Sequence, residues 1–159
     1  MSQHNQDALK RVNFFVIGAA KCGTTTLYAR LNAHPEVFLS PLKEPNYHSR
    51  ADLDPTRFSK AFKANTKLDL TDYFAAPDPL AKMQVGFVRE AADYARLFSG
   101  ANDTHRIVGE CSTSYLWSPS APAALKAALS TQSGASLTRR RIDQHDRRPH
   151  STTSCWARW

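Results

Sequence analysis

The chain has 159 residues, of which 42% are hydrophobic and 10% aromatic, and 21 Lys and Arg against 14 Asp and Glu give a formal net charge of +7. This length and composition are those of one globular domain and exclude a disordered chain. The longest apolar runs are only a few residues, which excludes a membrane-spanning helix.

The predicted elements alternate between strands and helices. An apolar run at 13–18 predicts a buried parallel strand, and helical spacing over 24–32 predicts a helix that ends before Pro35. The elements that follow are a strand at 36–40, a stiff non-helical segment at 41–45, a helix at 54–64, a mixed region with a loop at 68–83, a helix at 89–99 with a C-cap at Gly100, a strand at 106–110 and an alanine-rich helix from 119 or 120 to 129. This order predicts an α/β fold with a mostly parallel sheet.

Two features of the chain bear on its compartment. Residues 1–12 are polar and lack the apolar core of a secretory signal, so a cytoplasmic location and no membrane partner are expected. The three cysteines, Cys22, Cys111 and Cys155, include no Cys-x-x-Cys pair. They predict neither a disulfide framework nor a zinc site, and no metal is expected.

The charge is concentrated at the C-terminal end. Residues 1–129 carry 15 basic and 12 acidic side chains, whereas residues 130–159 carry six Arg and two Asp. This tail has neither helical nor alternating apolar periodicity, so we expect it to be disordered. Its arginines, with Trp156 and Trp159, leave a nucleic-acid-binding arm as an alternative, but we do not expect nucleic acid as a partner.

The most informative segment lies between the first predicted strand and the first predicted helix and reads Gly-Ala-Ala-Lys-Cys-Gly-Thr-Thr-Thr over residues 18–26. Backbone N–H groups of a tight loop and of a helix N-terminus converge on one point there, where they favour an anion such as phosphate. The nucleotide-triphosphatase loop Gly-x4-Gly-Lys-Ser/Thr has the same glycine spacing, but here Thr24 stands in place of its lysine. Lys21 lies three positions upstream, which indicates phosphate binding without the usual magnesium–triphosphate chemistry.

This loop resembles the 5′-phosphosulfate-binding loop, Gly-x-x-Lys-x-Gly-Thr-Thr-Ser/Thr, of sulfotransferases that use 3′-phosphoadenosine 5′-phosphosulfate (PAPS) as co-substrate. The resemblance implies a P-loop-type, three-layer α/β fold with a central parallel sheet. It also implies that Lys21 meets the phosphosulfate and stabilises the leaving phosphate. Gly23, Thr24, Thr25 and Thr26 would hold the 5′-phosphate, and no metal is required.

Residues 43–48, Lys-Glu-Pro-Asn-Tyr-His, lie where bacterial and heparan-type sulfotransferases carry a Lys-Glu-x-x-aromatic segment. The resemblance implies that Glu44 is the catalytic base, which takes a proton from the hydroxyl or amine of the acceptor. The alternative is a solvated Lys-Glu turn between two prolines. His34 and His48 are weaker candidates for the base.

Residues 109–119 resemble the Gly-Glu-x-Ser/Thr-x-x-Tyr segment of the same bacterial enzymes. Heparan-type members have a lysine directly after this glutamate, whereas here Cys111 follows Glu110, so a second catalytic lysine is absent at that place. The alternative is a strand end whose hydroxyls, such as that of Ser112, cap the next helix. Cys111 is expected to be a small packing residue.

The resemblance covers about residues 14–129, and the family's domain is longer than this chain. Members continue with a buried strand, an Arg-x-Pro segment and a serine that hold the 3′-phosphate. No apolar strand precedes Arg148, Pro149 and Ser151, so these roles are not carried over. We therefore divide the chain into a polar N-terminal arm (1–12), a partial sulfotransferase domain (13–129) and a non-family tail (130–159), with a frameshift near residue 129 as a hypothesis.

The expected function is transfer of a sulfuryl group from PAPS to a hydroxyl or amine acceptor of unknown class. For a shortened domain of this kind we expect weak donor binding and little or no turnover. Two alternatives remain at this point. One is a nucleotide-dependent kinase with the same loop architecture, and the other is a non-catalytic phosphate- or nucleic-acid-binding module.

Overall fold

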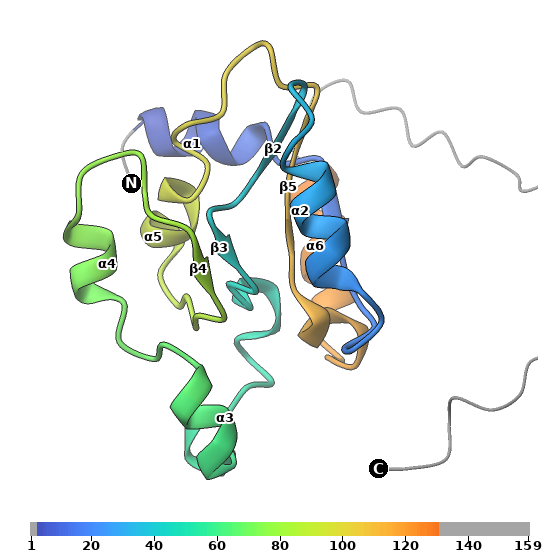
Figure 1. The fold of residues 1–159 in the computed structure, drawn as a ribbon, viewed down its shortest axis with the longest axis vertical. Helices are drawn as coiled ribbons and strands as arrows, with labels where there is room; N and C mark the ends of the chain where they lie inside the picture. Colours follow the sequence, from blue (N-terminus) through green and yellow to red (C-terminus); the bar gives the residue numbers. More distant parts are fainter. Residues whose placement is uncertain (1–2, 131–159) are drawn as a thin grey trace, which may run out of the picture.

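The computed structural model describes residues 3–130 and has a parallel sheet at its centre (Figure 1). Three strands pair in the order β1-β5-β2, with bounds Phe14–Val16, Ile107–Cys111 and Val37–Leu39. β1 and β2 lie inside segments predicted to be strands, and β5 overlaps the strand predicted at 106–110 but extends one residue further, to Cys111. Because all pairs are parallel, the carboxyl ends of the three strands lie at one edge of the sheet.

Shorter elements surround this sheet. A second parallel pair is formed by β3 (Leu42–Lys43) and β4 (Met83–Gln84). The α-helices are α1 (Gln3–Lys10), α2 (Thr24–Leu31), α3 (Lys60–Asn65), α4 (Thr71–Ala75), α5 (Ala91–Arg96) and α6 (Ala121–Ser130). Three 3₁₀ turns are η1 (Tyr47–Ser49), η2 (Pro55–Arg57) and η3 (Thr113–Leu116).

The period-2 alternation of the strands divides the core between the two faces of the sheet. One cluster faces α2 and consists of Phe14, Val16, Tyr28, Leu31, Val37, Leu39 and Cys111. The alternate strand residues Phe15, Phe38 and Val108 belong to a larger cluster with residues of α1, α4 and α5. In Figure 1, α2 lies on one side of β2 and β5, and α1 and α5 lie on the other. The arrangement is the predicted three-layer α/β fold with a central parallel sheet.

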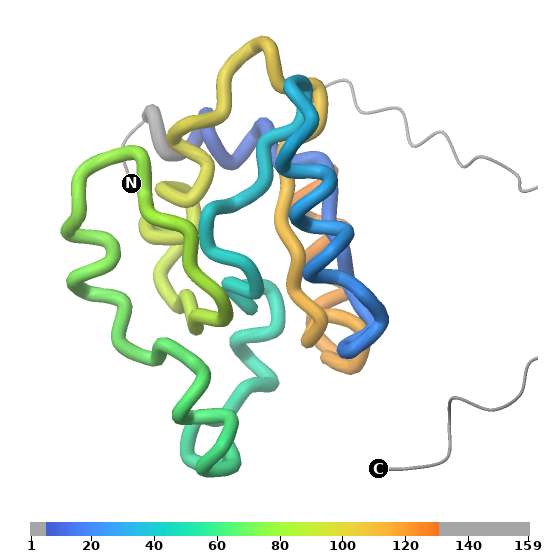
Figure 2. Tube along the Cα trace, viewed as in Figure 1, coloured from blue at the N-terminus to red at the C-terminus, as the bar shows by residue number. Residues whose placement is uncertain are grey.

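The helix predicted for residues 54–64 is wrong, because this stretch contains two separate starts. The Asp54 side chain accepts from the N–H of Thr56 and begins η2, and the Ser59 hydroxyl accepts from the N–H of Phe62 and begins α3. Phe58 between them is extended, with φ −65° and ψ 138°. Two N-caps within six positions therefore break the helix. Figure 2 shows the surrounding teal-to-green segment leaving the sheet and returning at β4.

The C-cap predicted at Gly100 is also wrong. Helix α5 ends at Arg96, and its C-cap Leu97 is right-handed, with φ −60°. The N–H groups of Leu97, Phe98 and Ser99 bond to carbonyls three residues earlier, which satisfies the end of the helix without a glycine.

Residues 1–12 include helix α1, and Ala8 and Val12 are buried in the larger core cluster, so this segment packs on the domain instead of standing apart from it. At the other end, the predicted tail beyond Ser130 lies outside the described residues, as do Arg148, Pro149 and Ser151. Within residues 3–130, no helix is both long and apolar enough to cross a membrane. The cytoplasmic location stays a prediction.

Candidate functional site

The phosphate loop, residues 18–23, connects β1 to α2 at the carboxyl edge of the sheet. Its backbone is left-handed at Lys21 (φ 63°) and at Gly23 (φ 78°). Gly23 is the N-cap of α2 and has no side chain to bond the first turn. Because the first N–H groups of a helix have no partner within it, those of residues 24–26 are placed to bind an anion.

The side chains of the loop suit the same ligand. Lys21, Thr25 and Thr26 are exposed, whereas Thr24 is buried. One cation and two free hydroxyls therefore accompany the N–H groups of the helix end. This donor set fits a phosphate or phosphosulfate group, because every member donates hydrogen bonds.

Glu44 follows β3 and has a left-handed backbone, with φ 62°. For a residue other than glycine this conformation costs roughly 1 kcal/mol or more, so surrounding contacts must hold it. Its N–H donates to the carbonyl of Cys111 (2.7 Å), and its carbonyl accepts from the N–H of Gly86 (3.1 Å) and from Nδ2 of Asn46 (2.8 Å). Strained residues held in this way are concentrated at functional sites.

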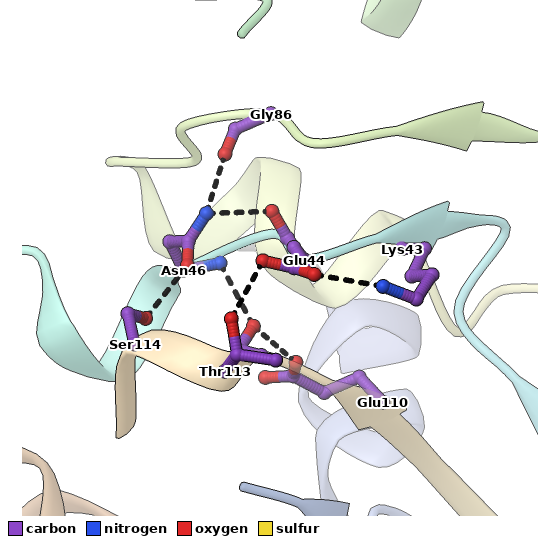
Figure 3. Close-up of polar contacts among 8 residues, drawn as sticks. Lys43, Glu44, Asn46, Gly86, Glu110, Thr113 and Ser114 are labelled. Carbon is purple, nitrogen blue, oxygen red and sulfur yellow. Dashed lines mark hydrogen bonds and ion pairs between the residues drawn. The ribbon is translucent and has the colours of Figure 1, made fainter. Parts of the chain in front are cut away.

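The carboxylate of Glu44 is held between two side chains (Figure 3). Oε1 lies 2.7 Å from Nζ of Lys43, and Oε2 accepts from Oγ1 of Thr113 at 3.0 Å. The side chain of Lys43 is only 3% exposed and that of Glu44 is 18% exposed. The alternative of a solvated Lys-Glu turn is therefore wrong, and the carboxylate has a fixed orientation.

Asn46 ties this segment to the end of β5 (Figure 3). Its Nδ2 bonds to the carbonyls of Glu44 and Gly86, and its Oδ1 accepts from Oγ of Ser114 at 2.6 Å. Its backbone N–H donates to Oγ of Ser112 at 3.1 Å. All side-chain polar atoms of Asn46 are thus used to hold the backbone around Glu44.

Glu110 lies behind this network and is fully buried. Its Oε2 accepts from Ser112 (2.7 Å), and its Oε1 accepts from the hydroxyls of Tyr94 (3.1 Å) and Tyr115. Burial raises the pKa of Glu110 to about 7, although the hydrogen bonds from Tyr115, Ser112 and Tyr94 act to lower it, and the charge of Glu44 adds to the rise. Ser112 therefore bonds Glu110 and does not cap η3.

We expect Glu110→Gln to change how the stability of the fold depends on pH. The pKa of Glu110 is raised from 4.5 to about 7 in the folded state, so folding takes up a proton between these values and stability falls as pH rises. We compare the free energies of unfolding in urea of the variant and the wild type. The value for the variant, relative to wild type, should rise by about 2–3 kcal/mol between pH 5 and pH 8. If the difference in the free energy of unfolding between the two proteins did not change with pH, the raised pKa of Glu110 would be contradicted.

The pH dependence of wild-type stability alone does not isolate Glu110, because His48 changes stability with pH in the opposite direction. Burial lowers the pKa of His48 to about 4, and the charge of Arg50 adds to this. His48 thus contributes stability that is lost as pH falls from 6.5 toward 4. Only the comparison with Glu110→Gln isolates the carboxyl group.

The other residues singled out as candidates lie apart from Glu44. His48 is enclosed by the rings of Phe15, Tyr47, Tyr94 and Tyr115 and lines a separate cavity with Phe15. His34 is exposed, and its Nδ1 accepts from the N–H of Glu36 at 3.2 Å. Cys111 is fully buried in the core facing α2, and burial raises the pKa of its thiol to about 12, which confirms it as a packing residue.

A cavity of about 190 Å³ brings the loop and the glutamate together. We call it the Glu44 cavity, and it is lined by Ala20, Glu44, Asn46, Leu53, Phe58, Phe62, Thr66, Gly86, Phe87, Thr113, Ser114 and Trp117. Ala20 belongs to the phosphate loop, one residue from Lys21. A larger cavity of about 430 Å³ lies between Phe38 and the loop around Pro79 and includes neither the phosphate loop nor Glu44. We place the candidate site at the smaller cavity because there a carboxylate, that of Glu44, adjoins the loop that is predicted to bind phosphate.

The sequence predicted the loop and Glu44 as site residues but not the side chains that contact Glu44. Lys43, Asn46 and Thr113 each contact Glu44, and Thr66 lines the cavity from a distant segment. Asn46 had a detectable signal, because asparagine is enriched among left-handed residues and its φ is 56°. Among the described residues, no three His, Cys, Asp or Glu side chains are grouped as metal ligands.

No family model matches the chain. Carbohydrate sulfotransferase 15 of Rattus norvegicus and of Mus musculus are each 37% identical to it over 105 residues, and that of Homo sapiens is 36% identical. The matched segment is 66% of this chain but only 18% of the length of each relative.

A solved structure is similar over a larger share of the chain. The crystal structure of a sulfotransferase from Alicyclobacillus acidocaldarius matches with a TM-score of 0.55 and 30% sequence identity. The match covers 76% of this chain and 41% of that one. The chain thus spans less than half of the length of that sulfotransferase.

Proposed function

From the premise that this chain belongs to the sulfotransferase family, we propose that its site transfers a sulfuryl group from PAPS to a hydroxyl or amine acceptor. The observation that carries the proposal is that the phosphate loop and the Glu44 carboxylate border one cavity. An anion-binding loop beside a fixed carboxylate is what a transfer between a phosphosulfate and a protonated nucleophile requires. The kinase alternative is not favoured, because the relatives are sulfotransferases.

The residues of the loop would bind the donor. The N–H groups at the start of α2 would hold the 5′-phosphate, together with Gly23, Thr24, Thr25 and Thr26. The ammonium of Lys21 would neutralise the charge that develops on that phosphate as the sulfur–oxygen bond breaks. Both contributions are electrostatic, and the left-handed backbone at Lys21 and Gly23 fixes the direction of the donors in advance.

Glu44 would act on the acceptor. The acceptor oxygen or nitrogen forms a bond to sulfur, the bond from sulfur to the phosphate oxygen breaks, and the acceptor proton passes to the Glu44 carboxylate. Adenosine 3′,5′-bisphosphate leaves with the electron pair of the broken bond. Lys43 and Thr113 each bond one oxygen of Glu44, so they set the orientation in which it meets the acceptor.

We expect Lys21→Ala to lower the affinity for adenosine 3′,5′-bisphosphate by about 10- to 100-fold, because a charge-assisted bond to the 5′-phosphate is lost. Isothermal titration calorimetry with the full chain measures this. Lys126→Ala, an exposed lysine on α6, is the matched control and should leave the affinity unchanged. Equal affinities of wild type and Lys21→Ala would exclude the assigned loop. ATP binding that depends on magnesium would favour the kinase alternative.

A further inference from the structure

The Glu44 cavity has an apolar wall that the transfer chemistry does not explain. Phe58 packs edge-on against Phe62 at 4.8 Å and against Phe87 at 6.1 Å between ring centroids. Phe62 and Trp117 also line the cavity, yet they are 42% and 59% exposed. Large aromatic faces left open to water beside a candidate base are suited to stacking on a ring of a ligand.

The polar groups that line the cavity are mostly committed to one another. The amide of Asn46 bonds two carbonyls and accepts from Ser114, and the hydroxyl of Thr113 donates to Glu44. A ligand with many hydroxyls would therefore find few partners in the cavity. Each hydroxyl buried there without a partner would cost about tenfold in affinity.

Thr66 is the exception. It is 8% exposed, and its Oγ1 is buried without a hydrogen-bond partner among the described residues. A buried hydroxyl without a partner is unfavourable in the empty cavity, so a ligand atom that bonds it would recover that loss. Thr66 lies just after α3, on the segment that also supplies Phe58 and Phe62.

We propose that the Glu44 cavity binds the acceptor and that the acceptor is a single-ring aromatic alcohol, a phenol with one further polar substituent. Its hydroxyl faces Glu44, its ring stacks against Phe62 and Trp117, and its second polar group bonds Oγ1 of Thr66. The volume of about 190 Å³ suits one ring. This inference rests on the proposed function, because Glu44 is taken as the base.

The class of acceptor follows from the balance of polar groups. A pyranose ring carries a hydroxyl on most of its carbons, whereas the cavity offers Glu44 and one unpaired hydroxyl. A substituted phenol presents two polar groups and two apolar faces, which matches the number of polar groups and the aromatic wall.

The test measures acceptor binding without the donor, by calorimetry with the full chain. The probes are 4-nitrophenol and methyl β-D-glucopyranoside, each a single ring, at about pH 6, where the hydroxyl of 4-nitrophenol is mostly protonated. We expect 4-nitrophenol to bind at least about tenfold more tightly than the sugar. Thr66→Val keeps the shape of the side chain and should lower the affinity for 4-nitrophenol about 3- to 10-fold. Phe62→Ala should lower this affinity by a similar factor.

Controls separate this inference from the proposed function and from misfolding. Thr104→Val changes a threonine that does not line the cavity and should leave 4-nitrophenol binding unchanged. Thr66→Val should also raise the urea midpoint of the free protein slightly, since it removes an unpaired buried hydroxyl. Lys21→Ala should retain 4-nitrophenol binding while losing adenosine 3′,5′-bisphosphate.

Three results would overturn the proposal: the sugar binding as tightly as 4-nitrophenol, neither probe binding, or Thr66→Val binding 4-nitrophenol like wild type. If 4-nitrophenol binds as expected but adenosine 3′,5′-bisphosphate does not bind wild type, the proposed function fails instead.

Discussion

Glu44→Gln is expected to slow sulfuryl transfer by about 10²- to 10⁴-fold, the usual range for loss of a general base. The amide keeps the size of the side chain but cannot accept the acceptor proton. Since Glu44 is not part of the phosphate loop, the affinity for adenosine 3′,5′-bisphosphate should change by about twofold or less.

The measurement uses enzyme in excess over ³⁵S-labelled PAPS, so that a single slow turnover is counted. Unsubstituted phenol, whose hydroxyl stays protonated at neutral pH, serves as the acceptor, with a simple amine as a second one. A transfer rate equal to that of wild type would remove Glu44 from the mechanism. A parallel loss of donor affinity would show that the variant had disturbed the phosphate loop.

The substitution also affects folding, and this must be separated from catalysis. Lys43 is buried and loses its counter-charge in Glu44→Gln, which costs roughly 3 kcal/mol of stability. The double variant Lys43→Met, Glu44→Gln removes both charges and should recover much of that stability. Its transfer rate should stay low, because the base is still absent. Recovery of transfer together with stability would show that the single variant had only misfolded.

Gly109→Ala is expected to prevent stable folding. A Cβ at Gly109 would lie 2.0 Å from the carbonyl oxygen of Phe14 and 2.7 Å from its carbonyl carbon. Both atoms belong to the backbone of β1, which pairs with β5 at this position, so the strands would have to separate. The expected loss is about 5 kcal/mol or more, a large share of the stability of a small domain.

Soluble yield and urea unfolding by circular dichroism test this prediction. Gly100→Ala is the matched control, because its added Cβ would meet only the ring of Phe38, at 3.0 Å, and a side chain can rotate away. The control should lose about 1 kcal/mol or less. A Gly109→Ala protein with the wild-type midpoint would mean that β1 and β5 do not pair in this register.

The sequence predicted the order of the central elements because their signals are local. Apolar runs at β1, β2 and β5 and the helical spacing of α2 depend only on neighbouring residues. β1, β2 and α2 form within the predicted bounds, and β5 extends one residue past them, to Cys111. Prediction was wrong where two local signals competed, as at Asp54 and Ser59, each of which caps its own short helix.

The candidate site could be predicted only in part for the same reason. The phosphate loop is contiguous, so its glycines, lysine and threonines could be recognised together. Glu44 could be named from its segment but not its environment, because Thr113 lies 69 positions away in the chain. The burial of Lys43 beside it arises from tertiary packing, which no local pattern records.

By itself, then, the sequence determined the parallel α/β fold, the anion-binding loop and the identity of the candidate base. Only the tertiary structure decided that the loop and Glu44 share a cavity and that Glu110 is buried with a pKa of about 7. It also decided that the Thr66 hydroxyl lies beside aromatic rings with no partner in residues 3–130. The physical reason is that secondary structure and loop chemistry arise from residues adjacent in the chain. Burial, desolvation and the pairing of polar groups arise from residues that only folding brings together.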